Sequence, residues 1–563
     1  MDRRFLAAIG LMMLVVLAPT FLFKRRPTPS LPAAGAVPTI GAPDTATVTS
    51  GTATAVPSPA PTAAAPAPRQ TSLPEDTVSV RSGLYEYVFS TRGARLIGAR
   101  LLRYRSMAVA PAGQGFTEPE AELVQPEDGL FALTLVAGGD SLPLGNVSFT
   151  PSATDLRVEG RTTLTFTATV EGAAAEVTYA FRPDDYRIDV AGRVTGLGPT
   201  GGLLLVGMGS GIRNTEADST LNYRDYALVV RRPGRDPQAI PFRKFDVDST
   251  RTEAGPFDWA ALKSKYFVIG AFAADSAASW AAAEVRRTDP AKLPHRARLR
   301  LSLPVASSGA FGWSVYAGPM EYPRLGAMGR EFNDVNPYGW PGFRTVMRPF
   351  ALGFRWLFVQ MHERLGLAYG VVLLLTGVLL RLILWPLNQK AMRSAMEMQA
   401  LQPKLQALQA RYKEEPQKLQ QEMFALYKEH NVNPMSGCWP MLLPMPILLA
   451  IFFVLNSTIE VRGVSFLWFP DLARPDPLYI IPVVSGLAMF ALSKLGQRGL
   501  PPNPQAKLMV FMMPAMMTLF GFNFASGLNL YWAASNIASL PQQYLIGRER
   551  MRRQGAPVVG TKR

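Results

Sequence analysis

The chain has 563 residues, a hydrophobic content of 48% and a formal net charge of +16. Its length allows several domains, and most long apolar runs lie after residue 364, which predicts a membrane protein with a large soluble part. The single cysteine, Cys438, excludes an internal disulfide framework. The three histidines lie far apart in sequence, so we expect no metal site and no cofactor. Much of the basic excess borders apolar segments, which favours contact with anionic lipid over specific binding of nucleic acid.

Residues 1–26 have the form of a signal sequence or a signal anchor. The apolar run from Phe5 to Phe23 exceeds an ordinary signal-peptide core and reaches the ~20 residues that a membrane span requires. We therefore expect an uncleaved anchor that forms the first span. Lys24 to Arg26 would, taken alone, place this end of the run in the cytoplasm, which conflicts with the topology derived below. Residues 27–72 are rich in Pro, Ala and Thr and predict an extended linker.

Residues 73–325 predict an all-β domain. Short segments of alternating apolar and polar residues are separated by Gly, Pro and Asp, which is typical of half-buried strands in a sandwich. The clearest such segments lie at 84–89, 163–170, 187–190 and 296–303. The acidic pairs Asp184-Asp185 and Asp246/Asp248 lie among turn residues, where carboxylates are more often solvated or capping than catalytic. A binding or spacing role is therefore the preferred interpretation of this domain.

Residues 343–363 predict an amphipathic helix at the membrane interface. Apolar and aromatic side chains recur at helical spacing, and basic side chains occupy another face. The apolar set comprises Phe343, Met347, Phe350, Phe354, Leu357, Phe358 and Met361, and the basic set comprises Arg344, Arg348, Arg355 and His362. The segment has too little apolar length to span and directly precedes an expected span. This placement favours the interface over packing on the sandwich.

Five apolar segments of the C-terminal half predict membrane spans, which together with the anchor give six. These segments are 365–387, 439–456, 478–495, 508–522 and 524–546. Lys and Arg number seven in 388–437, three in 494–507 and six in 547–563, against two in 459–477. The positive-inside rule therefore places the first three of these connecting segments and both termini in the cytoplasm, and residues 27–364 outside it.

Residues 388–437 predict a cytoplasmic hairpin of two polar helices, at 390–412 and 416–430. A short seam between them would be formed by Leu401, Leu405 and Leu408 facing Leu419, Met423 and Leu426. A charged hairpin of this kind is commonly a solvated coiled coil. Its expected place on the cytoplasmic side of the spans makes a role as a docking site an equal alternative. Residues 547–563 would form a basic cytoplasmic tail.

Arg381 is the one ionised side chain inside the expected span 365–387. A charge within hydrocarbon costs at least ~2.5 kcal/mol on insertion scales, so such residues are usually retained for a function. The alternative is that Arg381, which lies close in sequence to the polar residues Asn388 and Gln389, extends its long side chain to the interface.

The other expected spans carry unusual residue types. Segment 508–522 is rich in methionine, which forms adaptable apolar surfaces. Segment 524–546 carries Asn529 and Asn536 among other polar residues, and polar groups in lipid must face protein or a wet cavity. Together with Arg381 they predict a groove with one wet, positive wall and one apolar, adaptable wall. The alternative is that the polar residues only hold neighbouring helices together.

Several motifs resemble those of the YidC family of membrane protein insertases. They are Arg381 to Leu387, Leu401 to Lys404, Asn433-Pro434 with Gly437 to Pro440, and Ser526 to Trp532 with Ser535-Asn536. The order of the expected parts also resembles that family over essentially the whole chain. These parts are an anchor, an external β domain, an interfacial helix and a five-helix core with a cytoplasmic hairpin. The resemblance implies a multi-pass α-helical protein of the bacterial inner membrane, of the Gram-negative type with a large all-β periplasmic supersandwich domain.

The resemblance further implies an insertase and chaperone for nascent membrane proteins, without covalent chemistry or nucleotide hydrolysis. The implied substrate groove comprises Arg381, Asn529, Asn536, Trp532 and Thr376, and the implied hydrophobic slide comprises Met445, Met509, Met513 and Met516. Implied partners are the Sec translocon, the ribosome and a targeting receptor. Two positions depart from the family pattern: Trp532 stands where relatives often have tyrosine, and Gly377 stands where threonine is frequent.

Two other classes of protein remain open. A secondary transporter would carry intramembrane carboxylates or internal repeats, and neither is evident in the five C-terminal spans. An envelope carbohydrate-binding protein would place its site in the β domain, where no convincing acid pair occurs. Deletion of residues 73–318 would separate these classes, because an insertase core should retain its function and a sugar-directed protein should not.

Overall fold

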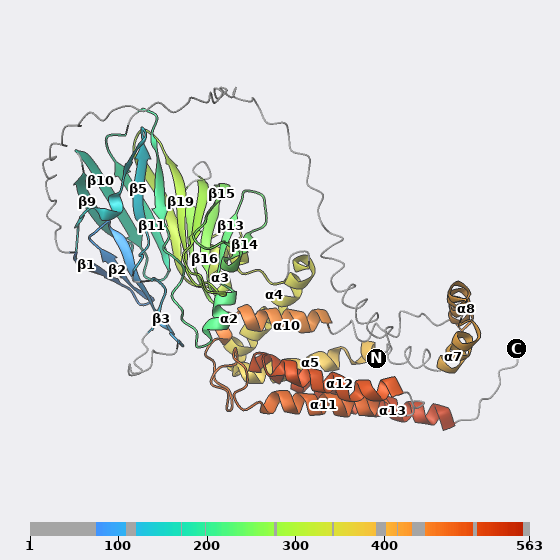
Figure 1. Cartoon of the computed structure of the whole chain (residues 1–563). Helices are drawn as coiled ribbons and strands as arrows, with labels where there is room; N and C mark the ends of the chain where they lie inside the picture. Colours follow the sequence, from blue (N-terminus) through green and yellow to red (C-terminus); the bar gives the residue numbers. More distant parts are fainter. Residues whose placement is uncertain are drawn as a thin grey trace, which may run out of the picture. The chain divides into compact units, whose positions relative to one another are not determined.

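The computed structural model describes most of the chain after residue 74. The described residues are 75–108, 120–125, 127–170, 172–197, 199–274, 279–339, 343–389, 401–413, 415–430, 445–498 and 504–555. The expected anchor and linker, the motif at 433–440 and the end of the basic tail lie outside them. Figure 1 shows strands in the N-terminal half of the described chain and helices in the C-terminal half.

The β domain contains three sheets within the described residues. The first has the order β4 (Glu120–Glu122), β3 (Arg95–Arg105), β2 (Tyr85–Ser90), β1 (Thr77–Arg81), β8 (Asp155–Arg157). The second has the order β14 (Gln238–Pro241), β13 (Ala227–Arg231), β16 (Trp259–Lys263), β17 (Phe267–Ala273), β20 (Ala310–Pro319), β11 (Arg187–Val194), β10 (Ala173–Phe181), β9 (Thr162–Val170), β7 (Thr150–Pro151). The third has the order β15 (Thr250–Phe257), β18 (Trp280–Arg287), β19 (Ala297–Val305), β12 (Gly202–Gly207), β5 (Ala132–Ala137), β6 (Asp140–Leu142).

Strand β19 shows how the alternating pattern produces these sheets. Leu299 and Leu301 are buried, whereas Arg298 and Arg300 are exposed on the opposite face. The other three clearest segments of the sequence overlap β2, β9 and β11. An all-β domain is therefore confirmed.

Strand β17 departs from this alternation because both of its faces are covered. All of its residues are buried, and the short helix η3 (Phe332–Val335) packs on it. Gly270 makes this contact possible, because a Cβ there would lie 2.6 Å from the ring of Phe332.

Aromatic rings fill much of the core of the β domain. Tyr85 and Tyr87 stack with ring centroids 4.1 Å apart, and Phe89 lies 4.7 Å from Tyr179. The Tyr179 hydroxyl donates a hydrogen bond to the Ala94 carbonyl at 2.7 Å, so its burial leaves no polar atom unsatisfied. Burial also raises the pKa of Tyr179 far above its ordinary range. These rings are therefore neutral packing groups.

The remaining elements are helical. Two lie within or beside the β domain, α2 (Ser219–Arg224) and α3 (Tyr322–Ala327), together with η1 (Leu144–Asn146) and η2 (Phe242–Lys244). The C-terminal half contains α4 (Arg344–Leu365), α5 (Tyr369–Ile383), α7 (Gln402–Arg411), α8 (Pro416–Glu429), α10 (Met445–Ser457), η5 (Ile459–Val461), α11 (Ile480–Gly496), α12 (Pro504–Gly521) and α13 (Ser526–Gly555). In the described part of the chain no helix is both long and apolar enough to cross a membrane, so the six expected spans are not confirmed.

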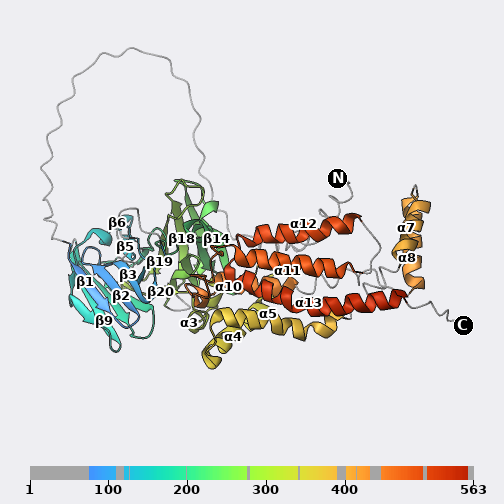
Figure 2. The same cartoon turned by 90° about the horizontal axis from the view of Figure 1, so that it is seen from below.

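Most of the C-terminal helices pack on one another in pairs. Helix α13 packs on α5 and α11, α11 packs on α12, and α10 packs on α4, and Figure 2 shows α11, α12 and α13 side by side. Gly377 permits the close approach of α5 to α13, because a Cβ there would lie 2.8 Å from the Tyr531 carbonyl oxygen. A larger side chain at this position would therefore require α5 and α13 to move apart.

The apolar face of helix α4 is partly buried against the rest of the protein. Met347, Ala351 and Phe358 are buried, while Trp356 and Phe350 remain exposed. Three of its basic side chains pair with carboxylates of the chain, because Arg344 and Arg348 lie 2.6 and 3.1 Å from Asp334 and Arg355 pairs with Glu460. The expectation that this helix lies in the membrane interface stays a prediction.

The loop between α10 and α11 contacts the β domain through Arg462. The Arg462 side chain is only 3% exposed. Its Nε donates to Glu216 Oε1 at 2.8 Å, its Nη1 to the Arg105 carbonyl at 2.9 Å and its Nη2 to the Thr215 carbonyl at 2.9 Å. The guanidinium also lies 5.2 Å from the centre of the Phe267 ring. This arginine therefore joins the helical part to the β domain.

Candidate substrate groove

Arg381 lies in the last turn of α5 and points its guanidinium toward α13. The side chain is half-buried. Its Nε donates a hydrogen bond to Ser539 Oγ, and Ser539 Oγ in turn donates to the Ser535 carbonyl at 2.6 Å. No carboxylate among the described residues lies within 4.0 Å of Arg381. The charge is thus held by a neutral hydroxyl and has no acidic partner in this part of the chain.

A small cavity of about 90 Å³ surrounds this guanidinium. Three helices contribute to it, namely α5, α10 and α13. Its lining residues are Leu380, Arg381, Leu384, Ile447, Leu448, Tyr531, Trp532, Ser535 and Asn536. The walls from α5 and α10 are apolar apart from Arg381, while α13 supplies the hydroxyl and amide groups. Such a site can offer hydrogen bonds to a polar chain segment and apolar contact to its neighbours.

The predicted groove residues divide into two groups. Arg381, Trp532 and Asn536 line the same cavity. The Asn536 amide also reaches Ser485 Oγ on α11 at 3.4 Å, which links the groove to the next helix. Because Tyr531 lines the cavity beside Trp532, the tyrosine-to-tryptophan departure leaves a phenol in the site.

Asn529 and Thr376 lie outside this cavity. Asn529 is 1% exposed and donates to the Gly521 carbonyl at 2.8 Å, so it fixes the end of α12. It lines a separate cavity of about 10 Å³, together with Trp532. Thr376 is 1% exposed and donates to the Val372 carbonyl of its own helix at 2.7 Å. In this structure Asn529 therefore connects α13 to the end of α12, and Thr376 bonds to the backbone of its own helix.

The methionines expected to form a slide lie on two helices. Met445 is at the start of α10 and is exposed. Met509 and Met516 of α12 are exposed, and Met513 is half-buried. They belong to a larger exposed apolar surface of α12 that also includes Leu508, Phe511, Met512, Leu519 and Phe520. None of them lines the cavity around Arg381, so the wet wall and the apolar surface are separate features.

Two groups that contact the predicted residues were not among the residues assigned to the groove, although Ser539 belongs to the polar residues of the expected span 524–546. Ser539 is the hydrogen-bond partner of Arg381, and Ser485 is a partner of Asn536. The positions of Trp532, Ser535 and Ser539 are three and four residues apart, which is the spacing of one helical face. That spacing could have assigned Ser539 to the groove, whereas Ser485 lies on another helix and has no local signal.

The hairpin helices α7 and α8 pack on each other. Leu401 and Leu405 are buried. Lys404 Nζ lies 2.8 Å from His430 Nε2, which joins the two arms near the end of α8. The two polar helices expected in this region thus contain α7 and α8, and their docking role stays a prediction.

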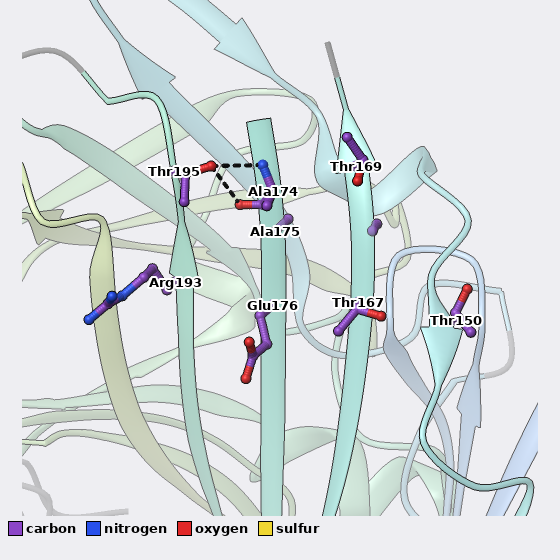
Figure 3. Close-up of a pocket in the computed structure, with 9 residues that line it drawn as sticks. Thr150, Thr167, Thr169, Ala174, Ala175, Glu176, Arg193 and Thr195 are labelled. Atoms are coloured by element: carbon purple, nitrogen blue, oxygen red, sulfur yellow. Dashed lines mark hydrogen bonds between the residues drawn. The ribbon is translucent and has the colours of Figure 1, made fainter. Parts of the chain in front are cut away.

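The β domain has a hollow on the exposed face of strands β7, β9, β10 and β11. Figure 3 shows threonine hydroxyls, Glu176 and Arg193 around it, with Thr195 bonded to the backbone of Ala174. Thr167, Glu176 and Arg193 are register partners on adjacent strands and form one polar row. The lining contains a single carboxylate, whereas glycoside hydrolysis ordinarily uses two. This hollow therefore gives no support to a carbohydrate-cleaving enzyme.

Comparisons with known proteins agree along the length of the chain. A family model described as 60Kd inner membrane protein matches residues 360–554, and a model of the YidC periplasmic domain matches residues 77–351. "Membrane protein insertase YidC" of Chloroherpeton thalassium is 30% identical over 508 residues, covering 84% of this chain and 83% of the relative. The protein of the same name from Ralstonia nicotianae is 34% identical over 422 residues, covering 73% of each chain.

Among solved structures, an active YidC insertase with its first transmembrane domain resolved also matches. It covers 84% of this chain and 94% of its own, at 17% identity and a TM-score of 0.34.

Proposed function

This chain belongs to the YidC family of membrane protein insertases, and we propose how its groove receives a client. Insertion of nascent membrane proteins into the inner membrane is the function of this family. In our proposal Arg381 binds acidic or polar side chains of the client segment that must cross the bilayer. The apolar parts of the client then move from the groove into lipid.

The absence of a carboxylate partner for Arg381 within the described residues carries this proposal. A guanidinium has five N–H donors, and Ser539 Oγ is the acceptor that the side chain finds here. The remaining donors are available to a carboxylate, and charge-assisted hydrogen bonds of this kind are roughly twice as strong as neutral ones. The apolar walls from Leu384, Ile447 and Leu448 would strengthen such a contact by excluding water.

The exposed apolar surface of α12 supports a route for the hydrophobic part of the client. Methionine side chains adapt to many shapes, and Met509, Met512 and Met516 are all exposed there. We assign the slide to this surface together with Met445 of α10. Partitioning of apolar side chains contributes about 25 cal/mol per Å² that leaves water, so insertion needs no nucleotide hydrolysis.

The proposed topology has six spans, with the anchor first and five spans in the C-terminal half. Both termini and the hairpin 388–437 lie in the cytoplasm, and residues 27–364 lie in the periplasm. The distribution of Lys and Arg between the connecting segments supports this orientation. On the cytoplasmic side, α7, α8 and the basic end of the chain are proposed contacts for the ribosome, a targeting receptor, the Sec translocon and anionic lipid.

The test is insertion of a small client into liposomes that contain the purified protein. Two clients are compared, one with an acidic translocated segment and one in which each Asp and Glu is replaced by the matching amide. Arg381→Gln should reduce protease protection of the acidic client by about tenfold, since a charged hydrogen bond contributes roughly 1.5–3 kcal/mol. The amide client should change by less than about twofold, which would be under ~0.5 kcal/mol.

The matched control is Arg193→Gln, which removes an exposed arginine of the β domain. Insertion of both clients should be unaffected by this change. Equal losses for the acidic and amide clients with Arg381→Gln would contradict capture of carboxylates by this residue.

A further inference from the structure

A cavity of about 800 Å³ lies between the β domain and the ends of α10, α12 and α13. The β domain contributes α2, β13, β14, β16 and the residues around Arg243, and the loop at 336–339 closes one side. The helical part contributes Phe452, Phe453 and Asn456 of α10 and the turn from Asn523 to Ala525. Its volume falls within the ~300–1,000 Å³ that is usual for ligand sites.

The wall from the β domain is basic. It carries four cationic side chains, Arg224, Arg243, Lys263 and Lys265, and two carboxylates, Asp218 and Asp225. Asp218 Oδ1 already accepts a hydrogen bond from the Leu221 backbone N–H at 2.9 Å, as the cap of α2. Within the described residues none of the four cations has an ion pair with a carboxylate. The cavity therefore has an excess of two positive charges, four minus two.

Lys263 is the cation held most firmly in this wall. It is the last residue of β16 and is 8% exposed. Its Nζ donates to Asn336 Oδ1 at 2.8 Å, which uses one of its three N–H donors. Burial lowers the pKa of Lys263, and the charge of Asp225 acts in the opposite direction. A bound anion would supply acceptors for the remaining donors.

The opposite wall is aromatic. The Phe452 ring lies 5.6 Å from Phe453 and 6.2 Å from Phe524, measured between ring centres. The two phenylalanines of α10 lie close to the end of that helix, and Asn456 and Asn523 add amide groups nearby. One side of the cavity thus suits an anion and the other suits a hydrocarbon chain.

We infer that this cavity binds the phosphate headgroup of an anionic phospholipid, with the acyl chains leaving along the aromatic wall. The inference rests on the proposed topology, which places the ends of α10, α12 and α13 at the periplasmic surface of the bilayer. A phospholipid carries an anion and hydrocarbon chains in one molecule, which matches the two walls. An acidic peptide would match the basic wall alone.

The experiment measures lipid binding to the full chain in a neutral detergent by native mass spectrometry. Phosphatidylglycerol should bind about tenfold more tightly than phosphatidylcholine, because both carry a phosphate but the choline cation of phosphatidylcholine is repelled by the excess positive charge of the basic wall. Lys263→Met should abolish this preference. The double variant Arg224→Ala/Arg243→Ala, which changes exposed side chains, should reduce the preference severalfold and keeps the test valid if Lys263→Met fails to fold. The control Arg193→Ala should leave it unchanged.

Three results would overturn the inference. The first is equal binding of both lipids by the wild-type chain. The second is complete displacement of phosphatidylglycerol by inorganic phosphate, which would indicate a simple anion site. The third is displacement by an acidic peptide, which would assign the cavity to a protein segment. Arg381→Gln should retain the lipid preference, so that loss of client capture and loss of lipid binding can be told apart.

Discussion

Two arginines lie in different regions of this molecule and have opposite surroundings. Arg462, between the helices and the β domain, donates to one carboxylate and two backbone carbonyls. Arg381, in the groove, donates to one serine hydroxyl. The first is satisfied by the protein itself, and the second retains donors for another molecule. The difference shows how a structural charge can be distinguished from a functional one, namely by counting acceptors rather than by burial.

The largest effect is expected for Arg462→Ala, which tests the structural side of the comparison. Removal of this guanidinium leaves Glu216 without its partner, and breaking a buried ion pair costs roughly 3–5 kcal/mol. Glu216 is 11% exposed, so we expect about 3 kcal/mol. Hydrogen exchange should report this loss of protection in residues 458–476. Insertion of acidic and amide clients should fall by the same factor, and a selective loss for the acidic client would contradict a structural role.

A smaller effect is expected for Gly377→Ala, which disturbs the contact of α5 with α13. The added Cβ would lie 2.8 Å from the Tyr531 carbonyl oxygen and 3.1 Å from Ala534 Cβ, and overpacking of this kind costs about 1–3 kcal/mol. Gly353→Ala in α4 is the matched control, because no atom lies within 4 Å of its added Cβ. Thermal unfolding in detergent should show a lower Tm for the first variant and an unchanged or higher Tm for the second. Equal shifts would mean that the close approach is unimportant.

Asp289 offers a third, weaker test, since it is a carboxylate that the β domain satisfies completely. It accepts from the backbone N–H groups of Ala291 and His295, both at 2.9 Å, and lies 2.6 Å from His295 Nδ1. Burial would raise the pKa of Asp289, but these N–H groups and the nearby charges of His295 and Arg287 lower it below the ordinary value. A lowered carboxyl pKa stabilises the fold above the unfolded-state pKa of about 4, and this stabilisation is lost as the pH falls through the folded-state pKa.

Asp289→Asn should therefore destabilise the β domain by roughly 1 kcal/mol at pH 7, as expected for loss of charged hydrogen bonds at a partly exposed loop. Denaturant unfolding at pH 7 and at pH 3 should show that the difference between wild type and variant shrinks at the lower pH. A difference that is constant with pH would contradict the contribution of the charge.

The smallest effect is expected on the apolar surface of α12. Met512→Ser/Met516→Ser should slow insertion of both clients by about two- to threefold, because less apolar contact is offered to the client. The substitution Met328→Ser, in a half-buried position beside the β domain, serves as the control for lost methionine. If the α12 variant reduced insertion of the acidic client more than that of the amide client, the α12 surface and Arg381 would act as one site. That result would contradict their separation.

The sequence predicted much of this fold because the relevant signals are local. Alternation of apolar and charged residues identified strands such as β19, and apolar runs identified the regions of α5 and α11. Arg381 could be selected because a charge in an apolar run stands out, whereas Trp532 was selected only through the resemblance to the family. Thr376 precedes Arg381 by five residues, which corresponds to about 140° around a helix, so helical geometry alone could have placed it on another face.

The remaining features depend on contacts that are distant in sequence. Arg462 and Glu216 are separated by 246 positions, and no local pattern connects them. Likewise, Asn529 shares a helical face with Asn536, but its seven-residue separation corresponds to about 10 Å along α13. Its contact with the end of α12 therefore appears only when the helices are packed.

A charge swap tests the central claim about Arg381 most directly. Arg381→Glu and the wild-type chain are each placed in liposomes without a membrane potential, which removes the effect of that potential on client charges. Each is given a client with an acidic translocated segment and a client in which Lys replaces every acid. Protease protection should favour the acidic client for the wild-type chain and the basic client for Arg381→Glu. The same order of preference for both chains would contradict electrostatic capture of the client at Arg381.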